Sequence, residues 1–213
     1  SPPKARNPFT GAGNYPSAVT FFQQRLCFGG SDNKPQTIYM SQTANFQNFN
    51  VSDPIKDDDS VTFTLASGRI NRVKWLVGAR SLIAGTIGGE WSIRGVDSAP
   101  ITPTSIDAQE VSNIGVAGIN PIQISGRAMF VQGDGKTIRE MTYDFASDTY
   151  IPKDQTVYAE HLFSGRRVVD WCFQRSPYNT FWAVLDDGSL AAYTYVLEHG
   201  VSGWSRHGTD GVV

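Results

Sequence analysis

Residues 80–94 read RSLIAGTIGGEWSIR: a run of apolar and small residues, a Gly-Gly turn, and a second run in which polar and apolar residues alternate. Two such runs joined by glycine are typical of a β-hairpin, because glycine adopts the backbone angles that tight turns require. The pattern returns at residues 127–141, RAMFVQGDGKTIREM, and at residues 180–194, TFWAVLDDGSLAAYT. A version with a longer loop joins residues 25–31 to residues 37–41.

Each of these hairpins contains one turn glycine, namely Gly30, Gly89, Gly135 and Gly188. The glycines recur roughly every 50 residues, a period that indicates propeller blades. Further strand-like segments precede the hairpins at residues 18–23, 70–77, 121–125 and 168–173, and the clearest ones that follow are residues 46–51 and 201–207. We therefore predict an all-β, β-propeller-like fold of about four antiparallel four-stranded blades. They form either a complete small propeller or part of a larger one, and a β-sandwich or barrel is the alternative.

Two segments fit the repeat poorly. Residues 98–118 are rich in small and polar side chains and predict an arm, a contact loop or a mobile segment. Residues 152–165 predict a connection between blades with a short helical turn. We interpret residues 15–213 as a single propeller-like domain and residues 1–14 as an extended segment or an arbitrary boundary. The chain is then a fragment of a longer protein.

Composition narrows the class of protein. Hydrophobic residues make up 40% and charged residues 18% of the chain, which is typical of a folded domain rather than a disordered one. The formal net charge is −2 and no basic patch stands out, so a sequence-independent grip on nucleic-acid phosphates is disfavoured. No apolar stretch is long enough to span a membrane.

Four carboxylates are the candidates for chemistry: Glu90, Glu140, Asp170 and Glu198. A glycosidase requires two such groups in one cleft. Glu90 follows the Gly-Gly turn and precedes Trp91, so it is predicted as an exposed hairpin residue, with a sugar site as the alternative. Asp170 precedes Trp171 in a strand and is predicted to tie strands together. We predict no catalytic residue.

Metal and cofactor sites are also not predicted. The three histidines, His161, His199 and His207, lack the spacing of metal ligands. The acidic run at residues 56–59 lacks the spacing of an EF-hand loop, so it is interpreted as a solvated loop rather than a calcium site.

Other conspicuous residues have structural interpretations. Residues 133–136, Gly-Asp-Gly-Lys, predict a β-turn, because a phosphate-binding loop would need more length and a following helix. Cys27 and Cys172 lie in apolar runs and predict buried free thiols. Arg166 and Arg167 predict a solvated turn, with an inter-subunit salt bridge as the alternative.

A succession of passages extends from about Tyr15 to about Gly211. In the first half these are residues 15–30, 35–41, 45–49, 57–59, 75–76 and 83–91. In the second half they are residues 130–132, 138–140, 143, 187–190, 194–195, 198–201 and 203–204. The succession resembles a family of tail tubular, nozzle or stabilisation proteins of short-tailed phages and related prophages. No single passage is specific, and the order carries the resemblance.

The resemblance implies a non-enzymatic structural component of a phage tail, located in the virion and made in the host bacterial cytoplasm. Such a protein forms a homo-oligomeric ring below the portal, six-fold by analogy, and docks the adaptor and fibres around a channel through which DNA passes without specific binding. No cofactor is implied. One alternative is a glycan-binding propeller that uses surface aromatics, namely Tyr39, Trp91, Trp182 and Trp204. A less favoured alternative is a glycosidase.

Overall fold

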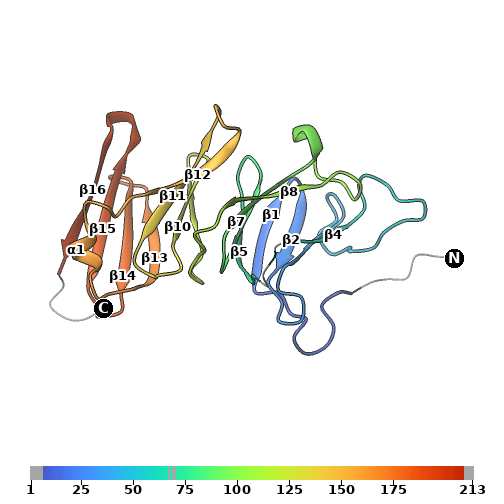
Figure 1. Ribbon diagram of the computed structural model, residues 1–213, viewed down its shortest axis with the longest axis horizontal. Helices are drawn as coiled ribbons and strands as arrows, with labels where there is room; N and C mark the ends of the chain where they lie inside the picture. The colour runs from blue at the N-terminus through green and yellow to red at the C-terminus, as the bar shows by residue number, and fades with distance from the viewer. Residues whose placement is uncertain (1–6, 67, 69–70, 209–213) are drawn as a thin grey trace.

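The computed structural model describes residues 7–66, 68 and 71–208. They form four four-stranded antiparallel sheets, with little helix (Figure 1). The first sheet contains β1 (Ala18–Phe22), β2 (Arg25–Gly29), β3 (Thr37–Met40) and β4 (Val61–Thr64). The second contains β5 (Val73–Gly78), β6 (Leu82–Thr86), β7 (Glu90–Arg94) and β8 (Asp107–Ser112). The predicted all-β, propeller-like fold is confirmed.

The two later sheets repeat this organisation. The third contains β9 (Ile122–Ile124), β10 (Arg127–Val131), β11 (Ile138–Asp144) and β12 (Thr149–Asp154). The fourth contains β13 (Val168–Gln174), β14 (Thr180–Leu185), β15 (Leu190–Val196) and β16 (Val201–His207). The helical turns are η1 (Val96–Ser98), α1 (Glu160–Phe163) and η2 (Leu197–His199). In every sheet, strands that follow one another in the chain are hydrogen-bonded neighbours.

The predicted hairpins are the central strand pairs of the sheets. Residues 80–94 contain β6 and β7, and the other three hairpins contain β2–β3, β10–β11 and β14–β15. The second strand of each sheet is nearly all apolar, and in the second and third sheets this strand is covered on both faces. In β6, for example, all five residues are buried. Leu82 and Ala84 face the first sheet, and Ile83 faces the third.

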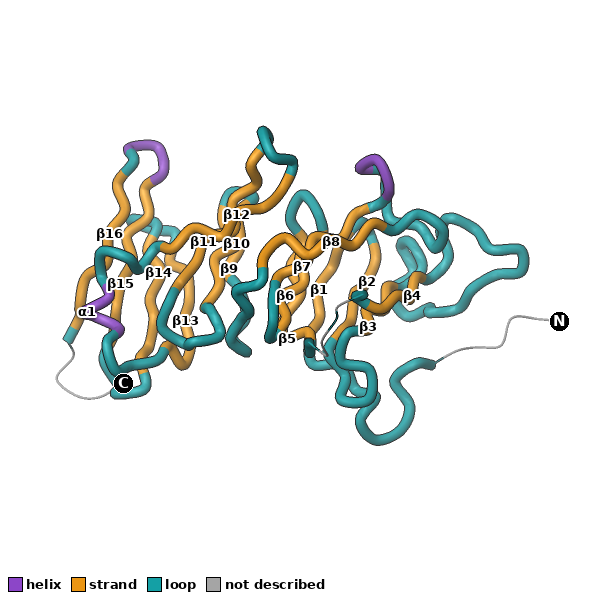
Figure 2. Tube along the Cα trace, in the orientation of Figure 1, coloured by secondary structure: helices purple, strands orange, loops and turns teal. Residues whose placement is uncertain are grey.

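The sheets pack face to face through three hydrophobic cores, each between two consecutive sheets. Figure 2 shows them side by side along the long axis, with the first and fourth sheets at opposite ends. Over the described residues the row therefore does not close on itself. It forms an open part of a propeller-like arrangement, and the end sheets lack a neighbouring sheet on their outer faces.

The structure corrects which segment forms the fourth strand of the first sheet. Residues 46–51, predicted as a strand, lie in a loop, and the fourth strand is β4, residues 61–64. The Asn48 side chain explains the loop, because its oxygen accepts a hydrogen bond from the Asn50 amide and its nitrogen donates to Gln42. Short polar side chains that bond nearby backbone favour turns over strands.

Other segments match the predictions in part. The segment at residues 98–118 contains β8, which sequence reasoning missed, and the connection at residues 152–165 contains the expected helical turn, α1. Residue 70, the predicted start of β5, lies outside the described residues. Residues 1–6 also lie outside them, whereas residues 7–14 form turns in which Phe9 packs against Phe28.

The turn glycines are required for two different reasons. Gly30 has a φ of +75°, the left-handed region that favours glycine, as predicted. Gly89 is not among the residues with positive φ. A side chain there would instead approach the Ser112 carbonyl oxygen to 2.4 Å, so Gly89 is required because β8 passes close to the turn.

Candidate functional sites: an uncovered end face and a polar cleft

The four candidate carboxylates do not come together. Glu90 lies on the face of the second sheet that meets the third, whereas Glu140 lies on the face of the third sheet that meets the fourth. The third sheet thus separates them. Asp170 and Glu198 are exposed. These four residues therefore do not form the carboxylate pair that a glycosidase requires, and the alternative built on them fails.

Glu90 was predicted to be exposed, and this is wrong. Its side chain is fully buried at 0% exposure, and neither carboxylate oxygen accepts a hydrogen bond from the described residues. Burial raises the pKa of Glu90, although the nearby Ser112 hydroxyl and the positive charge of Arg139 oppose the shift. The strand alternation explains the burial: Trp91 faces the first sheet, so Glu90 must face the third.

Glu140 is buried with partners that no sequence pattern indicated. Three side chains donate to its carboxylate: Arg127, Tyr195 at 2.7 Å and Gln155 at 2.8 Å. A further bond, from Thr142, measures 3.3 Å. Tyr195 belongs to the fourth sheet, so this carboxylate joins two sheets.

The aromatic residues proposed for glycan binding are engaged in packing. Trp91 and Tyr39 are both 4% exposed. Trp204 stacks on Tyr193 at 4.8 Å between ring centroids, and Trp182 donates to Gln174 at 2.7 Å. The aromatic side chains on which the glycan hypothesis rested are therefore not available on the surface to stack on a sugar.

The remaining predicted features are structural. Within the described residues, no group of three His, Cys, Asp or Glu side chains could hold a metal ion. Asp134 caps the predicted β-turn by accepting from the Lys136 and Thr137 amides. Arg166 pairs with Asp187 of the same chain. No helix among the described residues is long and apolar enough to cross a bilayer.

Two predictions about loops and thiols need correction. The acidic run at residues 56–59 is not wholly solvated: Asp59 is buried and accepts hydrogen bonds from Ser52 and Lys56 amides, which closes the loop. Cys27 is buried as predicted, and burial raises the pKa of its thiol to about 12. Cys172 is exposed, because its face of the fourth sheet has no covering sheet.

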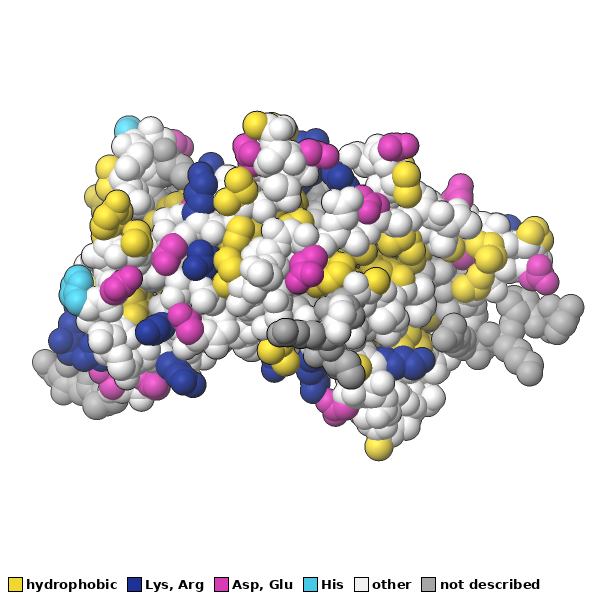
Figure 3. All heavy atoms as spheres, in the orientation of Figure 1, with side chains coloured by type: hydrophobic (Ala, Val, Ile, Leu, Met, Phe, Trp, Pro, Cys, Tyr) yellow, Lys and Arg dark blue, Asp and Glu magenta, His cyan; other side chains and the backbone are white. Residues whose placement is uncertain are grey.

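The uncovered outer face of the first sheet is the first candidate site. Val19, Phe21, Leu26 and Phe28 lie side by side on this face, because β1 and β2 pair Val19 with Phe28 and Phe21 with Leu26. Val19 is 59% and Phe21 62% exposed. In Figure 3, hydrophobic side chains gather over the part of the molecule that holds the first two sheets. An exposed apolar group of this kind is typical of an interaction surface.

Loops cover only part of this face. Phe9 and Phe49 pack on Phe28, and Phe46 contacts Phe21 at 5.1 Å between ring centroids. The rings of Phe9, Phe28, Phe46 and Phe49 line a wide hollow of ≈ 580 Å³ at the end of the row. The sequence showed the aromatic residues, but not that they gather at an uncovered face.

The second candidate site is a polar cleft between the second and third sheets, with a volume of ≈ 150 Å³. Ser81 and Ser92 lie 2.8 Å apart at their hydroxyls, and the Ser81 amide donates to the Tyr150 hydroxyl at 3.3 Å. The β5–β6 turn, the β7–β8 loop and the β11–β12 hairpin contribute the walls.

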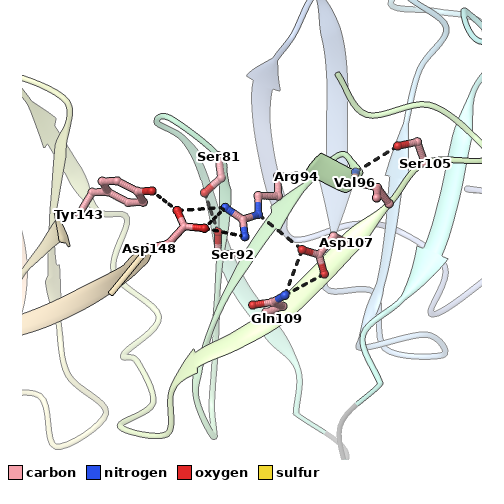
Figure 4. A network of polar contacts seen from close by, with 9 residues as sticks. All are labelled: Ser81, Ser92, Arg94, Val96, Ser105, Asp107, Gln109, Tyr143 and Asp148. Carbon is pink, nitrogen blue, oxygen red and sulfur yellow. Dashed lines mark hydrogen bonds and ion pairs between the residues drawn. The ribbon is translucent and has the colours of Figure 1, made fainter. Parts of the chain in front are cut away.

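Arg94 links the two sides of the cleft (Figure 4). Its guanidinium lies 3.2 Å from Asp148 of the third sheet's hairpin and 3.4 Å from Asp107 of β8. Tyr143 also donates to Asp148, and this bond together with Arg94 holds the pKa of Asp148 below its ordinary value. Sequence reasoning noted Arg80 and Arg94 only as the ends of a hairpin and gave no signal for Asp148.

Comparisons with known proteins add little about function. No family model matches the chain, and no curated protein matches it. One similar solved structure is a luciferin-regenerating enzyme, with 11% identity, a TM-score of 0.31, and coverage of 80% of this chain and 68% of that one. A likeness this weak does not indicate what this chain does.

These findings correct the function predicted from the sequence. We predicted a structural component of a phage tail, but no family model and no curated protein matches the chain, so nothing in the comparisons supports that role. That prediction is wrong. The reason is physical: the ordered passages are mostly strands and glycine turns, which any four-stranded repeat requires, so they predict blades rather than an assembly. The family resemblance itself stays a prediction.

Proposed function

We propose that this protein is a non-enzymatic binding module that associates head to tail with a second copy of itself through its two end faces. The observation that carries the proposal is the uncovered apolar face of the first sheet, where Phe21 is 62% exposed. Burying such side chains is favourable by about 25 cal/mol for each Å² removed from water.

The fourth sheet supports the choice of a second copy as the partner. Its outer face carries Trp182, Val184, Leu190 and Ala192, which pair across β14 and β15. Neither this set nor the set on β1 and β2 contains a charged residue. Asp170 of β13 pairs with Val184 and is exposed on the same face, so the contact has to leave its carboxylate in water at the rim.

The internal packing supplies the geometry for this association. Three times within the chain, the outer face of one sheet packs on the next sheet through a hydrophobic core. The free faces of the first and fourth sheets are the two halves of one more interface of this kind. Head-to-tail contact between copies would complete it, either closing a ring of two or extending a row.

Sedimentation velocity over a range of concentrations tests the proposal. We expect wild-type protein to associate and Phe21→Asp to shift it to monomer, because a carboxylate would have to be desolvated at the interface. Val184→Asp, on the opposite face, is expected to do the same. The control is Tyr158→Asp, which places the same charge at a side chain that is 97% exposed and on neither face.

A mixture of the two interface variants distinguishes head-to-tail contact from contact between like faces. Phe21→Asp retains an intact fourth sheet and Val184→Asp retains an intact first sheet. An equimolar mixture is therefore expected to form hetero-dimers although neither variant forms homo-dimers. Wild-type protein that stays monomeric at every concentration, or a Tyr158→Asp variant that dissociates as Phe21→Asp does, would overturn the proposal.

A further inference from the structure

We propose that the polar cleft between the second and third sheets binds a small organic carboxylate, with Arg80 as the group that receives the anion. This site is separate from the end faces, so it does not depend on association between copies. Its walls come from the second and third sheets and three of their connections, with Gln23 of the β1–β2 turn also in the lining.

Arg80 is exposed and forms no ion pair among the described residues, although its charge helps to lower the pKa of Asp148. Its guanidinium carbon lies 4.7 Å from the centre of the Tyr143 ring and 5.3 Å from that of Phe145. Among the described residues, none accepts a hydrogen bond from Arg80. Stacking on two rings restricts the side chain while its N–H groups remain available at the edge of the guanidinium. A planar cation arranged in this way suits a carboxylate, which it can bind through two parallel hydrogen bonds.

Arg94, the other guanidinium of the cleft, differs in this respect. It is already paired with Asp107 and Asp148, so its charge is offset within the protein. The cleft lining holds Arg80, Arg94 and a single carboxylate, Asp148. With Asp107, which pairs with Arg94 but is not a lining residue, these charges balance, and Arg80 is the cation of the cleft that forms no ion pair.

The rest of the cleft favours an organic ligand over a bare ion. The Tyr150 hydroxyl accepts from the Ser81 amide, which leaves its own proton to donate into the cleft. Val111 and the rings of Tyr143 and Tyr150 supply apolar wall. A volume of ≈ 150 Å³ suits a small molecule and not a polymer chain.

Titration with benzoate at constant ionic strength, followed by ¹H–¹⁵N NMR, tests this inference, with acetate and inorganic phosphate as parallel probes. We expect saturable shifts at the amides of residues 80–81, 92–94 and 148–150 with benzoate, and weaker binding of acetate and phosphate. Arg80→Gln should weaken benzoate binding about tenfold or more, because a charge-assisted hydrogen bond is lost. Tyr150→Phe should weaken it severalfold.

Arg175→Gln is the matched control, because Arg175 is an exposed arginine on the β13–β14 turn, outside the cleft. It removes the same charge and should leave benzoate binding unchanged. Three results would overturn the inference: no saturation with benzoate up to tens of millimolar, an equal loss in Arg175→Gln and Arg80→Gln, or phosphate binding as tight as benzoate binding. Circular dichroism of each variant confirms that it is folded.

Discussion

The interface between the second and third sheets and the interface between the third and fourth each bury one glutamate, and the two glutamates differ in their partners. Glu140 accepts hydrogen bonds from Arg127, Tyr195 and Gln155. Glu90 accepts none from the described residues. Both sit on the third strand of their sheet and face the sheet that follows. The third strand of these two sheets therefore holds a carboxylate that joins two sheets in one case and a carboxylate that is buried without a hydrogen-bond donor in the other.

The largest effect is expected from Glu140→Ala. It would remove the acceptor of the Tyr195 and Gln155 donors and leave Arg127 only the Tyr195 hydroxyl, at 3.1 Å, which should lower the free energy of unfolding by about 3 kcal/mol. Urea unfolding measures the change, with Glu198→Ala, at an exposed carboxylate, as the control. A loss no greater than that of the control would mean that Glu140 does not join the sheets.

The second prediction concerns packing beside Glu90. An added methyl group at Gly85 would lie 2.3 Å from the Trp75 ring, which is 1% exposed and cannot move aside. Gly85→Ala should cost about 2 kcal/mol of stability through overpacking. At Gly118 a methyl group meets nothing within 4 Å, so Gly118→Ala serves as the control in the same thermal melts. Equal effects of the two variants would contradict the tight packing of this interface.

The third prediction uses the pH dependence of Glu90. Burial raises its pKa, so the folded protein holds this proton more tightly than the unfolded chain does. Its contribution to stability is therefore fully present below the unfolded pKa of about 4.3 and is lost as the pH rises through the folded pKa. Glu90→Gln removes this titration.

We thus expect Glu90→Gln to be more stable than wild type in alkaline buffer, with a free energy of unfolding higher by about 1 kcal/mol. Below the unfolded pKa the two proteins should have nearly the same free energy of unfolding. Unfolding curves across a pH series measure the difference. A stability difference that is independent of pH would show that the pKa of Glu90 is the same in the folded protein and the unfolded chain. Glu140→Gln, which loses an ion pair, should instead destabilise the protein at neutral pH.

The smallest effect is expected for the labelling of the two thiols. Cys27 lies on a covered face of a sheet and Cys172 on an uncovered one. Cys27 lies in the core between the first and second sheets, whereas Cys172 is exposed on the fourth. A thiol-reactive reagent should label Cys172 quickly and Cys27 only on unfolding, because the raised pKa of Cys27 leaves almost no thiolate. Mass spectrometry of the labelled peptides checks this. Fast labelling of Cys27 would indicate that the first two sheets separate readily.

Much of the fold could be predicted from local pattern. The hairpins, the preceding strands and the turn α1 lie where the sequence places them, because the glycine turns and apolar runs act over a few residues. β4 and β8 were missed or misplaced, since β4 is short and β8 is rich in polar residues. Such strands gain their stability from the neighbour they pair with, which a local pattern does not reveal.

The candidate sites depended on contacts distant in sequence. Asp148 meets Arg94 across 54 residues, and Ser81 meets Tyr150 across 69. Neither pair has a spacing that a motif could show. The burial of Glu90 also depends on the sheet packed against it, since the Gly-Gly turn beside it predicts an exposed residue.

The sequence by itself determined the repeating unit, the β class and the four glycine turns, because hairpins are specified by residues close together in the chain. Only the tertiary structure decided which faces are covered, that the row of sheets stays open over the described residues, and where a cleft forms. Alternation of polar and apolar residues along a strand indicates that its two faces differ in polarity. Whether a face meets another sheet, a loop or solvent depends on how distant segments pack.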